Sequence, residues 1–460
     1  MKSEKSAVAL TNYELCIINY ELLCIFALEM NQATLDYIRE HAEADVRQLA
    51  LQGTKNPEVD LTFALDQIAG RQKAKTKLPS WAAIDGIVYP PHLSMEQCSS
   101  EQTARYKGCW VLGVGCWLND IKDTKRSDPS VTFVDLTGGF GVDFAFIASA
   151  INQQLTPTTH HLVYVEQQAL LCAISSENFK LLGLNHIEVV CADGVEYLHQ
   201  LEHADLIYLD PARRDNHGAR TYGIADCTPN VLELRDELLD KADRVMLKLS
   251  PMLDWQKAVE DLGHVSEVHI VSVDNECKEL LLILEESDER REVRDYSVHC
   301  VNLLSDSTSQ HLSFLSTITS QPSTNTHHPT PNTHHPTPNT FSYLFEPNAS
   351  IMKAGCFTLL EQRFNVSQLD KNSHLFVSDK DCSDFPGRRF TIEKTTSMNK
   401  RELKTALAGI DRANIAVRNF PLSVAELRKR LKLKDGGNLY LFATTIAGRQ
   451  HQLFLCRKIE

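Results

Sequence analysis

The spacing of apolar residues predicts different structures along the 460-residue chain. From residue 30 to about residue 108 apolar side chains recur at helical spacing, and Val59, Phe63 and Ile68 fall roughly on one helix face. Asn56 is followed by proline and acidic residues, which is typical of a helix start because Asn caps a helix and Pro fits its first turn. These residues predict a helical N-terminal domain.

The stretch "LPSWAAIDGIVYPP" interrupts this helical pattern and predicts a loop. Two interpretations of its Trp81 and Tyr89 are contact with a substrate and packing in the core. Core packing is the one we favour, because large aromatic side chains supply much of the apolar area that a domain buries.

Residues 1–29 are apolar enough to suggest a membrane segment, but Glu14 and Glu21 interrupt them. A membrane helix needs about 20 consecutive apolar residues, and no small-residue cleavage site for a signal peptide is evident. The tetrapeptide Asn-Tyr-Glu-Leu also occurs twice in this stretch. We interpret residues 1–29 as a low-complexity extension, with the first domain starting at Met30.

From residue 109 to residue 292 short apolar runs alternate with helical patterns. Predicted strands are 131–136, 161–166, 187–191, 205–209, 243–249, 264–272 and 279–286. This alternation predicts an α/β fold with a doubly wound, Rossmann-like parallel sheet. Ligands of such sheets bind at the carboxyl ends of the strands.

The stretch "VDLTGGFGVD" stands where the first of these strands passes into a helix. Glycines at such a junction let a ligand approach the backbone, and a helix N-terminus offers free N–H groups. Acidic residues also follow three further strands, at Glu166, Asp193 and Asp210. Together these strand ends predict a nucleotide site.

Charge and cysteine content suggest the partner and the compartment. The whole chain carries −13, but residues 385–460 hold 16 Lys/Arg against 6 Asp/Glu, so this part is +10 and the remainder −23. A basic module on an acidic body favours a polyanionic partner. The 13 cysteines include no CxxC pair, which predicts no metal framework and indicates a reducing, cytoplasmic setting.

Composition changes again after residue 293. "NTHHPTP" occurs twice in tandem within residues 293–340, and such Pro/Thr repeats predict a connector rather than a core. We expect no native metal site at its histidines. Residues 341–384 and 385–460 return to strand and helix patterns, which predicts two small α+β modules.

The strand-end residues resemble the motifs of class I methyltransferases that use S-adenosylmethionine (SAM). That resemblance implies that the glycine-rich turn contacts the ribose and methionine parts of SAM, that Glu166 accepts from the ribose hydroxyls and that Asp193 accepts from the adenine amine. The implied cofactor-binding residues are Asp135, Thr137, Gly139, Gly141, Glu166 and Asp193.

Each of these residues also has a simpler interpretation. Glu166 and Asp193 could cap the helices that follow them. A glycine turn also occurs in dehydrogenases, but the third glycine of the dinucleotide pattern is replaced here by Phe144. The order and spacing of the motifs together therefore favour a methyltransferase over a dehydrogenase.

"DPARR" resembles the fourth motif, which lines the reaction centre, and it predicts Asp210, Pro211 and Arg213 as catalytic residues. The stacking aromatic of amino-methylating enzymes is missing, which argues against methylation of an exocyclic amine. Asp210 could hold the acceptor or take its proton, and Arg213 with Arg214 could hold a phosphate. Lys248 could do the same, and an ion pair that closes the site is the alternative for all three cations.

As a whole, the chain from Met30 to Glu460 resembles a bacterial methyltransferase family with ferredoxin-like and THUMP-like C-terminal parts, on residues such as "EPNASIMKAG" and "NFPLSVAELRKRLKLKDGG". This resemblance implies a tRNA or rRNA substrate, with Arg428, Lys429 and Arg430 as RNA contacts or, alternatively, a solvated helix face. Two other functions stay open: methylation of a small molecule or protein, and RNA binding without catalysis. The sequence does not identify the nucleotide or the atom methylated.

Overall fold

A computed structural model describes residues 31–113, 131–155, 159–213, 223–286, 293–319, 341–446 and 450–459. The chain divides into two compact units, residues 1–268 with 280–290 and residues 269–279 with 291–460. Both the predicted extension at 1–29 and the histidine repeat lie outside the described residues. None of the described helices is both long and apolar enough to cross a lipid bilayer.

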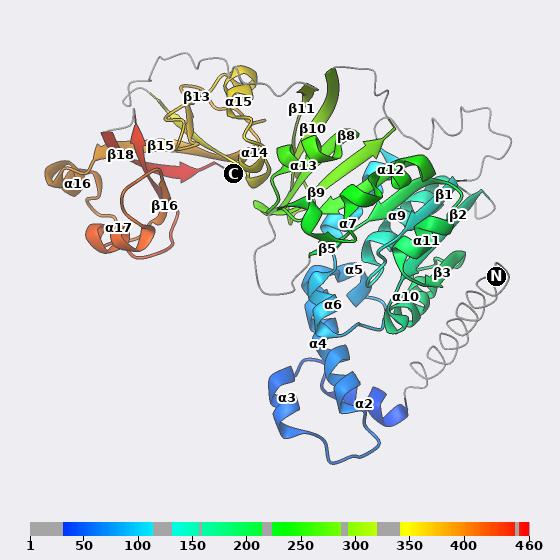
Figure 1. Ribbon diagram of the computed structural model, residues 1–460. Helices are drawn as coiled ribbons and strands as arrows, with labels where there is room; N and C mark the ends of the chain where they lie inside the picture. The colour runs from blue at the N-terminus through cyan, green and yellow to red at the C-terminus, as the bar shows by residue number, and fades with distance from the viewer. Residues whose placement is uncertain are drawn as a thin grey trace, which may run out of the picture. The chain divides into compact units, whose positions relative to one another are not determined.

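The first unit begins with helices, coloured blue to cyan in Figure 1. They are α2 (Gln32–Glu40), α3 (Val46–Gln52), α4 (Leu61–Lys77), α5 (Pro79–Ala82), α6 (His92–Gln97) and α7 (Glu101–Leu112). The helix start predicted at Asn56 is wrong: α4 is capped by Asp60, which accepts from Phe63 N, while Asn56 accepts from Glu58 N in a turn. The predicted loop around Trp81 contains the short helix α5, because Pro79 stands at its first position.

Trp81 and Tyr89 are core residues, 1% and 4% exposed, as the favoured interpretation predicts. The Trp81 ring meets Phe140 at 5.2 Å between centroids, and Val88 N donates to the Asn178 side chain at 2.9 Å. These contacts pack the N-terminal helices onto the α/β part of the same unit.

The sheet of the first unit has the strand order β9-β7-β4-β1-β2-β3. Its strands are β1 (Val131–Asp135), β2 (His160–Glu166), β3 (Ile187–Cys191), β4 (Ala204–Leu209), β7 (Ala242–Leu249) and β9 (Glu276–Glu285). The helices of this part are α9 (Val142–Gln154), α10 (Ala169–Leu181), α11 (Gly194–Gln200), α12 (Val231–Lys241) and α13 (Trp255–Leu262). β7, β4, β1, β2 and β3 run parallel, whereas β9 is antiparallel to β7, so the sheet is mixed rather than wholly parallel.

The parallel ladder brings the carboxyl ends of neighbouring strands to one edge. Phe133 of β1 pairs with Leu162 of β2 and with Leu206 of β4. An aromatic cluster packs beside these strands, and in it Phe144 of α9 lies 5.1 Å from Phe179 of α10, measured between ring centroids. This rigid base positions the loops that follow each strand.

In the second unit, β10 (Val293–Leu303) and β11 (Ser309–Thr319) form an antiparallel hairpin, and β10 lies next to β8 (Val265–Val273). The predicted connector is therefore wrong over residues 293–319, which form strands. The reason is that apolar residues such as Val298 and Cys300 alternate with polar ones on an exposed face, so composition alone resembles a linker.

The rest of the second unit is a seven-stranded sheet of order β13-β14-β12-β15-β18-β17-β16 with helices beside it. Its elements are β12 (Tyr343–Pro347), α14 (Ala349–Ala354), α15 (Phe357–Phe364), β13 (Ser367–Gln368), β14 (Phe376–Ser378), β15 (Gly387–Ser397), α16 (Lys400–Ala406), β16 (Asn414–Arg418), α17 (Val424–Leu431), β17 (Leu439–Ile446) and β18 (Gln450–Lys458). The α+β rhythm predicted for this region is present, and Asn348 caps α14 as its position suggests.

Candidate active site

The glycine-rich turn joins β1 to α9 and is fixed by its own backbone. Asp135 ends β1, is 1% exposed, and accepts from Thr137 N at 2.9 Å. Burial raises the pKa of Asp135 well above that of an ordinary carboxyl. Gly139 and Gly141 have φ of +56° and +76°, in the left-handed region that only glycine enters without strain.

The two left-handed glycines serve different purposes. A Cβ on Gly141 would lie 2.7 Å from the Phe179 ring, so this glycine is needed for packing. A Cβ on Gly139 would meet nothing nearer than Thr137 O at 3.8 Å. Neighbouring atoms therefore leave room for a methyl group at Gly139, and packing does not explain the glycine there.

Glu166 and Asp193 follow β2 and β3, beside this turn. Glu166 accepts from Gly139 N at 2.9 Å and from Gln168 N at 2.8 Å, so it ties two strand-to-helix turns together. Asp193 caps α11 through bonds from Val195 N and Glu196 N. The capping role weighed in the sequence is thus present for Asp193, whereas α10 has no side-chain cap and Glu166 bonds to the N–H of its N-cap residue, Gln168. A carboxylate keeps lone pairs for further donors.

Asp210 follows β4 and faces the same edge. Its N–H donates to Thr137 Oγ1 at 2.7 Å, and its carboxylate forms an ion pair with Lys248 of β7. The ion pair weighed for Lys248 is thus present. Pro211 is buried, whereas only the backbone of Arg213 is described, in the pairing of β5 (Ala212–Arg213) with β6 (Cys227–Thr228); Arg214 lies outside the described residues.

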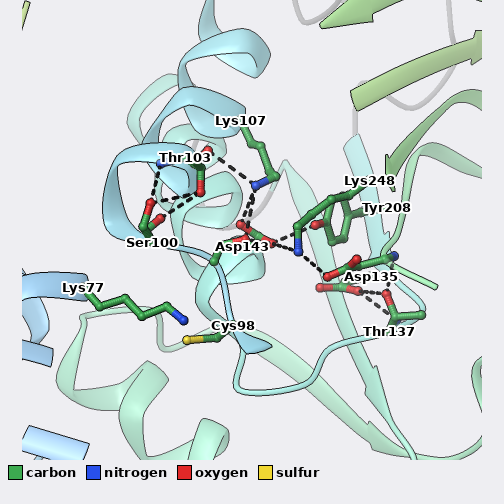
Figure 2. Close-up of polar contacts among 12 residues, drawn as sticks. Lys77, Cys98, Ser100, Thr103, Lys107, Asp135, Thr137, Asp143, Tyr208 and Lys248 are labelled. Atoms are coloured by element: carbon green, nitrogen blue, oxygen red, sulfur yellow. Dashed lines mark hydrogen bonds and ion pairs between the residues drawn. The ribbon is translucent and has the colours of Figure 1, made fainter. Parts of the chain in front are cut away.

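A second, buried carboxylate lies near the same Lys248 ammonium: Asp143, on the first turn of α9 (Figure 2). Its Oδ1 lies 3.0 Å from Lys107 Nζ. Its Oδ2 accepts from Ser99 Oγ at 2.6 Å and from Tyr208 OH at 2.8 Å, and lies 3.8 Å from Lys248 Nζ. Successive ion pairs through Asp143 and Lys248 therefore connect Lys107 of the N-terminal helices to Asp210.

These charges decide the ionisation of Asp143. Burial opposes the charged form, but the cations Lys107 and Lys248 outweigh it and lower the pKa of Asp143 to about 2. Because this pKa is depressed, the ionised carboxylate stabilises the fold above the usual aspartate pKa of about 3.9, and the contribution is lost as the pH falls toward 2.

Sequence reasoning missed Lys107, Ser99 and the role of Asp143. The one signal was Asp143 itself, an acid in an otherwise apolar helix start. Lys107 stands on a helical stretch and is 0% exposed, which no periodicity reveals. A lysine is almost never fully buried unless it is paired.

The predicted RNA contacts on α17 divide into two kinds. Arg428 donates to Ala413 O at 3.1 Å and to Asp435 at 2.6 Å, so its guanidinium joins α17 to neighbouring loops. Lys429 and Arg430 are exposed. The alternative of a purely solvated face therefore does not describe Arg428.

Comparison with known proteins identifies two C-terminal domains and a relative of the whole chain. Residues 387–458 match a THUMP domain-like family model, and residues 343–386 match a ferredoxin-like domain model. The crystal structure of a "putative methyltransferase" from Porphyromonas gingivalis is 31% identical, covers 93% of this chain and 98% of that chain, and has a TM-score of 0.74. This chain belongs to the same family, the class I SAM-dependent methyltransferases with a C-terminal THUMP-like domain.

Other solved structures resemble part of the methyltransferase. A SAM-dependent methyltransferase from Agrobacterium tumefaciens is 17% identical over 48% of this chain and 62% of that chain, with a TM-score of 0.28. An rRNA methylase from Streptococcus thermophilus is 16% identical over 40% of this chain and 96% of that chain, with a TM-score of 0.27. No curated protein matches the sequence.

The cofactor of this methyltransferase family is S-adenosyl-L-methionine, and the strand ends fit it. The absence of a close neighbour at the Gly139 Cβ position allows a ligand to approach the backbone there. Acidic side chains at the ends of β1, β2 and β3 supply acceptors for the hydroxyl, amine and ammonium groups that SAM carries.

Alanine substitutions at Gly139 and Gly141 are expected to distinguish a loss of ligand binding from a loss of packing. Both positions incur similar backbone strain, of roughly 1–2 kcal/mol. Gly141→Ala should lower the unfolding temperature further, because its Cβ meets Phe179 at 2.7 Å. Gly139→Ala should weaken SAM binding about tenfold or more in calorimetry, a loss of about 1.4 kcal/mol per factor of ten. Wild-type SAM affinity in Gly139→Ala would contradict this site.

Lys107→Met is expected to destabilise the protein by about 3–5 kcal/mol, because it leaves the buried Asp143 with one cation fewer. Lys75→Met is the matched control, since Lys75 pairs with Glu43 at the surface and should change stability little. Denaturant unfolding measures both. Equal effects would show that the buried pair is no more important than a surface one.

Proposed function

We propose that this methyltransferase transfers the methyl group of SAM to a nucleotide of tRNA or rRNA. The observation that carries the proposal is the hydrogen bond from the Asp210 N–H to Thr137, which joins Asp210 to the glycine-rich turn. In addition, residues 385–460 of the same chain carry a net charge of +10. A cationic module is expected to bind a polyanion, and the THUMP-like domain lies within it. SAM, RNA and the reduced cysteines favour an activity in the cytoplasm.

In this proposal each strand end holds one part of the cofactor. The turn at Gly139 and Gly141 lies against the ribose and methionine parts, and Asp135 accepts from the ammonium directly or through water. Glu166 accepts from the ribose hydroxyls, and Asp193 accepts from the adenine amine. When bound, SAM supplies a methyl group already activated on a sulfonium.

Residues after β4 serve the acceptor. Asp210 receives a hydrogen bond, or the departing proton, from the nucleotide atom that gains the methyl group. Lys248 fixes the Asp210 carboxylate from one side, which leaves the other free to orient the acceptor for in-line transfer. Pro211 keeps the turn rigid, and Arg213 contacts a phosphate of the target strand.

Asp210→Asn tests the catalytic role. Its neutral amide cannot take a proton or pair with Lys248, so methyl transfer from labelled SAM to RNA should fall by roughly 10²–10⁴-fold. SAM affinity should stay near wild type, because Asp210 is assigned to the acceptor. Asp236→Asn, on an exposed side chain, serves as the control. Full turnover by Asp210→Asn would exclude the assigned role, and RNA-independent methylation would exclude RNA as substrate.

Replacing Lys429 and Arg430 with Ser tests the RNA contacts of α17. Removing each cation that touches a phosphate should flatten the dependence of log affinity on log salt by roughly 0.7 for single-stranded RNA. Lys180→Ser with Lys257→Ser removes two exposed cations from the first unit and should leave the slope unchanged. Filter-binding titrations of tRNA at several salt concentrations measure it. Equal slopes in wild type and the α17 variant would assign that face to solvent.

A further inference from the structure

A buried acid in the second unit holds two arginines at the surface. Glu346 of β12 is 3% exposed. Its Oε2 accepts from Arg388 Nε at 2.7 Å and also from Arg388 Nη2, and its Oε1 accepts from Arg418 Nη2 at 2.7 Å. Arg388 lies directly opposite Glu346 on β15, whereas Arg418 ends β16, at the far edge of the strand order.

This cluster has more positive charge than its structural role needs. One arginine would neutralise Glu346, so these three side chains carry a net +1, which the nearby carboxylate of Asp370 partly offsets. Both guanidiniums stay half exposed, at 39% and 41% of their side chains. Beyond Glu346, Arg418 donates to Val417 O at 3.3 Å, and Arg388 lies 5.9 Å from the Phe390 ring centroid. An arginine has five N–H donors, so each retains several for a ligand.

The geometry suits an anion. The carboxylate fixes both guanidiniums, so little side-chain entropy is lost when a phosphate binds them. Exposure also matters, because a fully buried triad would be closed to any ligand.

An aromatic pair lies within electrostatic reach of Arg418. Phe357 and His374 stack at 4.2 Å between ring centroids, and both are half-buried. Burial and then the positive charge of Arg418 lower the pKa of His374, which favours the neutral ring. Neutral aromatic faces stack on nucleobases, which a phosphate without a base does not offer.

We infer that Glu346, Arg388 and Arg418 form a phosphate clamp for single-stranded RNA at the junction of the ferredoxin-like and THUMP-like segments. This inference rests on the proposed function and assigns the substrate strand a second contact besides α17. Asp370 bounds the clamp, and its carboxylate accepts from Asn372 N and Asn419 Nδ2. RNA is favoured over a phosphorylated peptide because of the aromatic pair.

Single substitutions test the clamp without leaving Glu346 unpaired. Arg388→Gln and Arg418→Gln should each weaken binding of a labelled mixed-sequence oligoribonucleotide roughly tenfold, the effect of one charge-assisted hydrogen bond. Arg457→Gln removes the same charge from a surface pair with Glu393 and should change affinity less than about twofold. SAM binding and thermal unfolding check that the chain is folded.

If Arg418→Gln fails to fold, Arg418→Lys decides, because it keeps the charge but not the planar fork, and should still weaken RNA binding. Tight RNA binding by wild type with no loss in either arginine variant would overturn the clamp and leave the proposed function standing. Absence of RNA binding by wild type would overturn both. Displacement of the oligoribonucleotide by a phosphoserine peptide of equal charge would overturn the assignment to RNA.

Discussion

The first unit depends on one buried carboxylate. Asp143 forms ion pairs with Lys107 of the N-terminal helices and Lys248 of β7, and it accepts a hydrogen bond from Tyr208 of β4. A buried charge is tolerated only when its partners are complete, so these elements are held in one arrangement. Lys248 also pairs with Asp210. The proposed acceptor side of the site therefore depends on the N-terminal helices, which lie outside the sheet.

In the proposed function, the cofactor side and the acceptor side of the site meet at a single threonine. Thr137 donates its N–H to Asp135 and accepts from Asp210 N through its hydroxyl. A shift of the glycine turn would therefore move both sides together. Methyl transfer requires an in-line approach, and such approaches lose rate steeply when reacting groups are misplaced by an ångström.

The sequence predicts best the features that follow directly from the geometry of a parallel sheet. Asp135, Glu166 and Asp210 could be placed at one edge because the carboxyl ends of these strands must lie together. It could not predict the contact of Lys107 with Asp143, which joins positions 36 residues apart in different elements. It also misplaced the start of α4, since Asn56 and Asp60 are both good caps and tertiary packing chose between them.

Asp143 and Glu346 show why counting charges does not locate a binding surface. Each acid pairs with two cations, but the Lys107 side chain is 0% exposed whereas the Arg388 side chain is 39% exposed. The first cluster is almost closed to solvent and holds the fold and the Asp210 carboxylate, while the second retains donors that an anion can reach. Arg428, the most suggestive cation of α17, is bonded to Ala413 and Asp435. Exposure and spare donors, rather than net charge, decide which cations are available to an anionic partner.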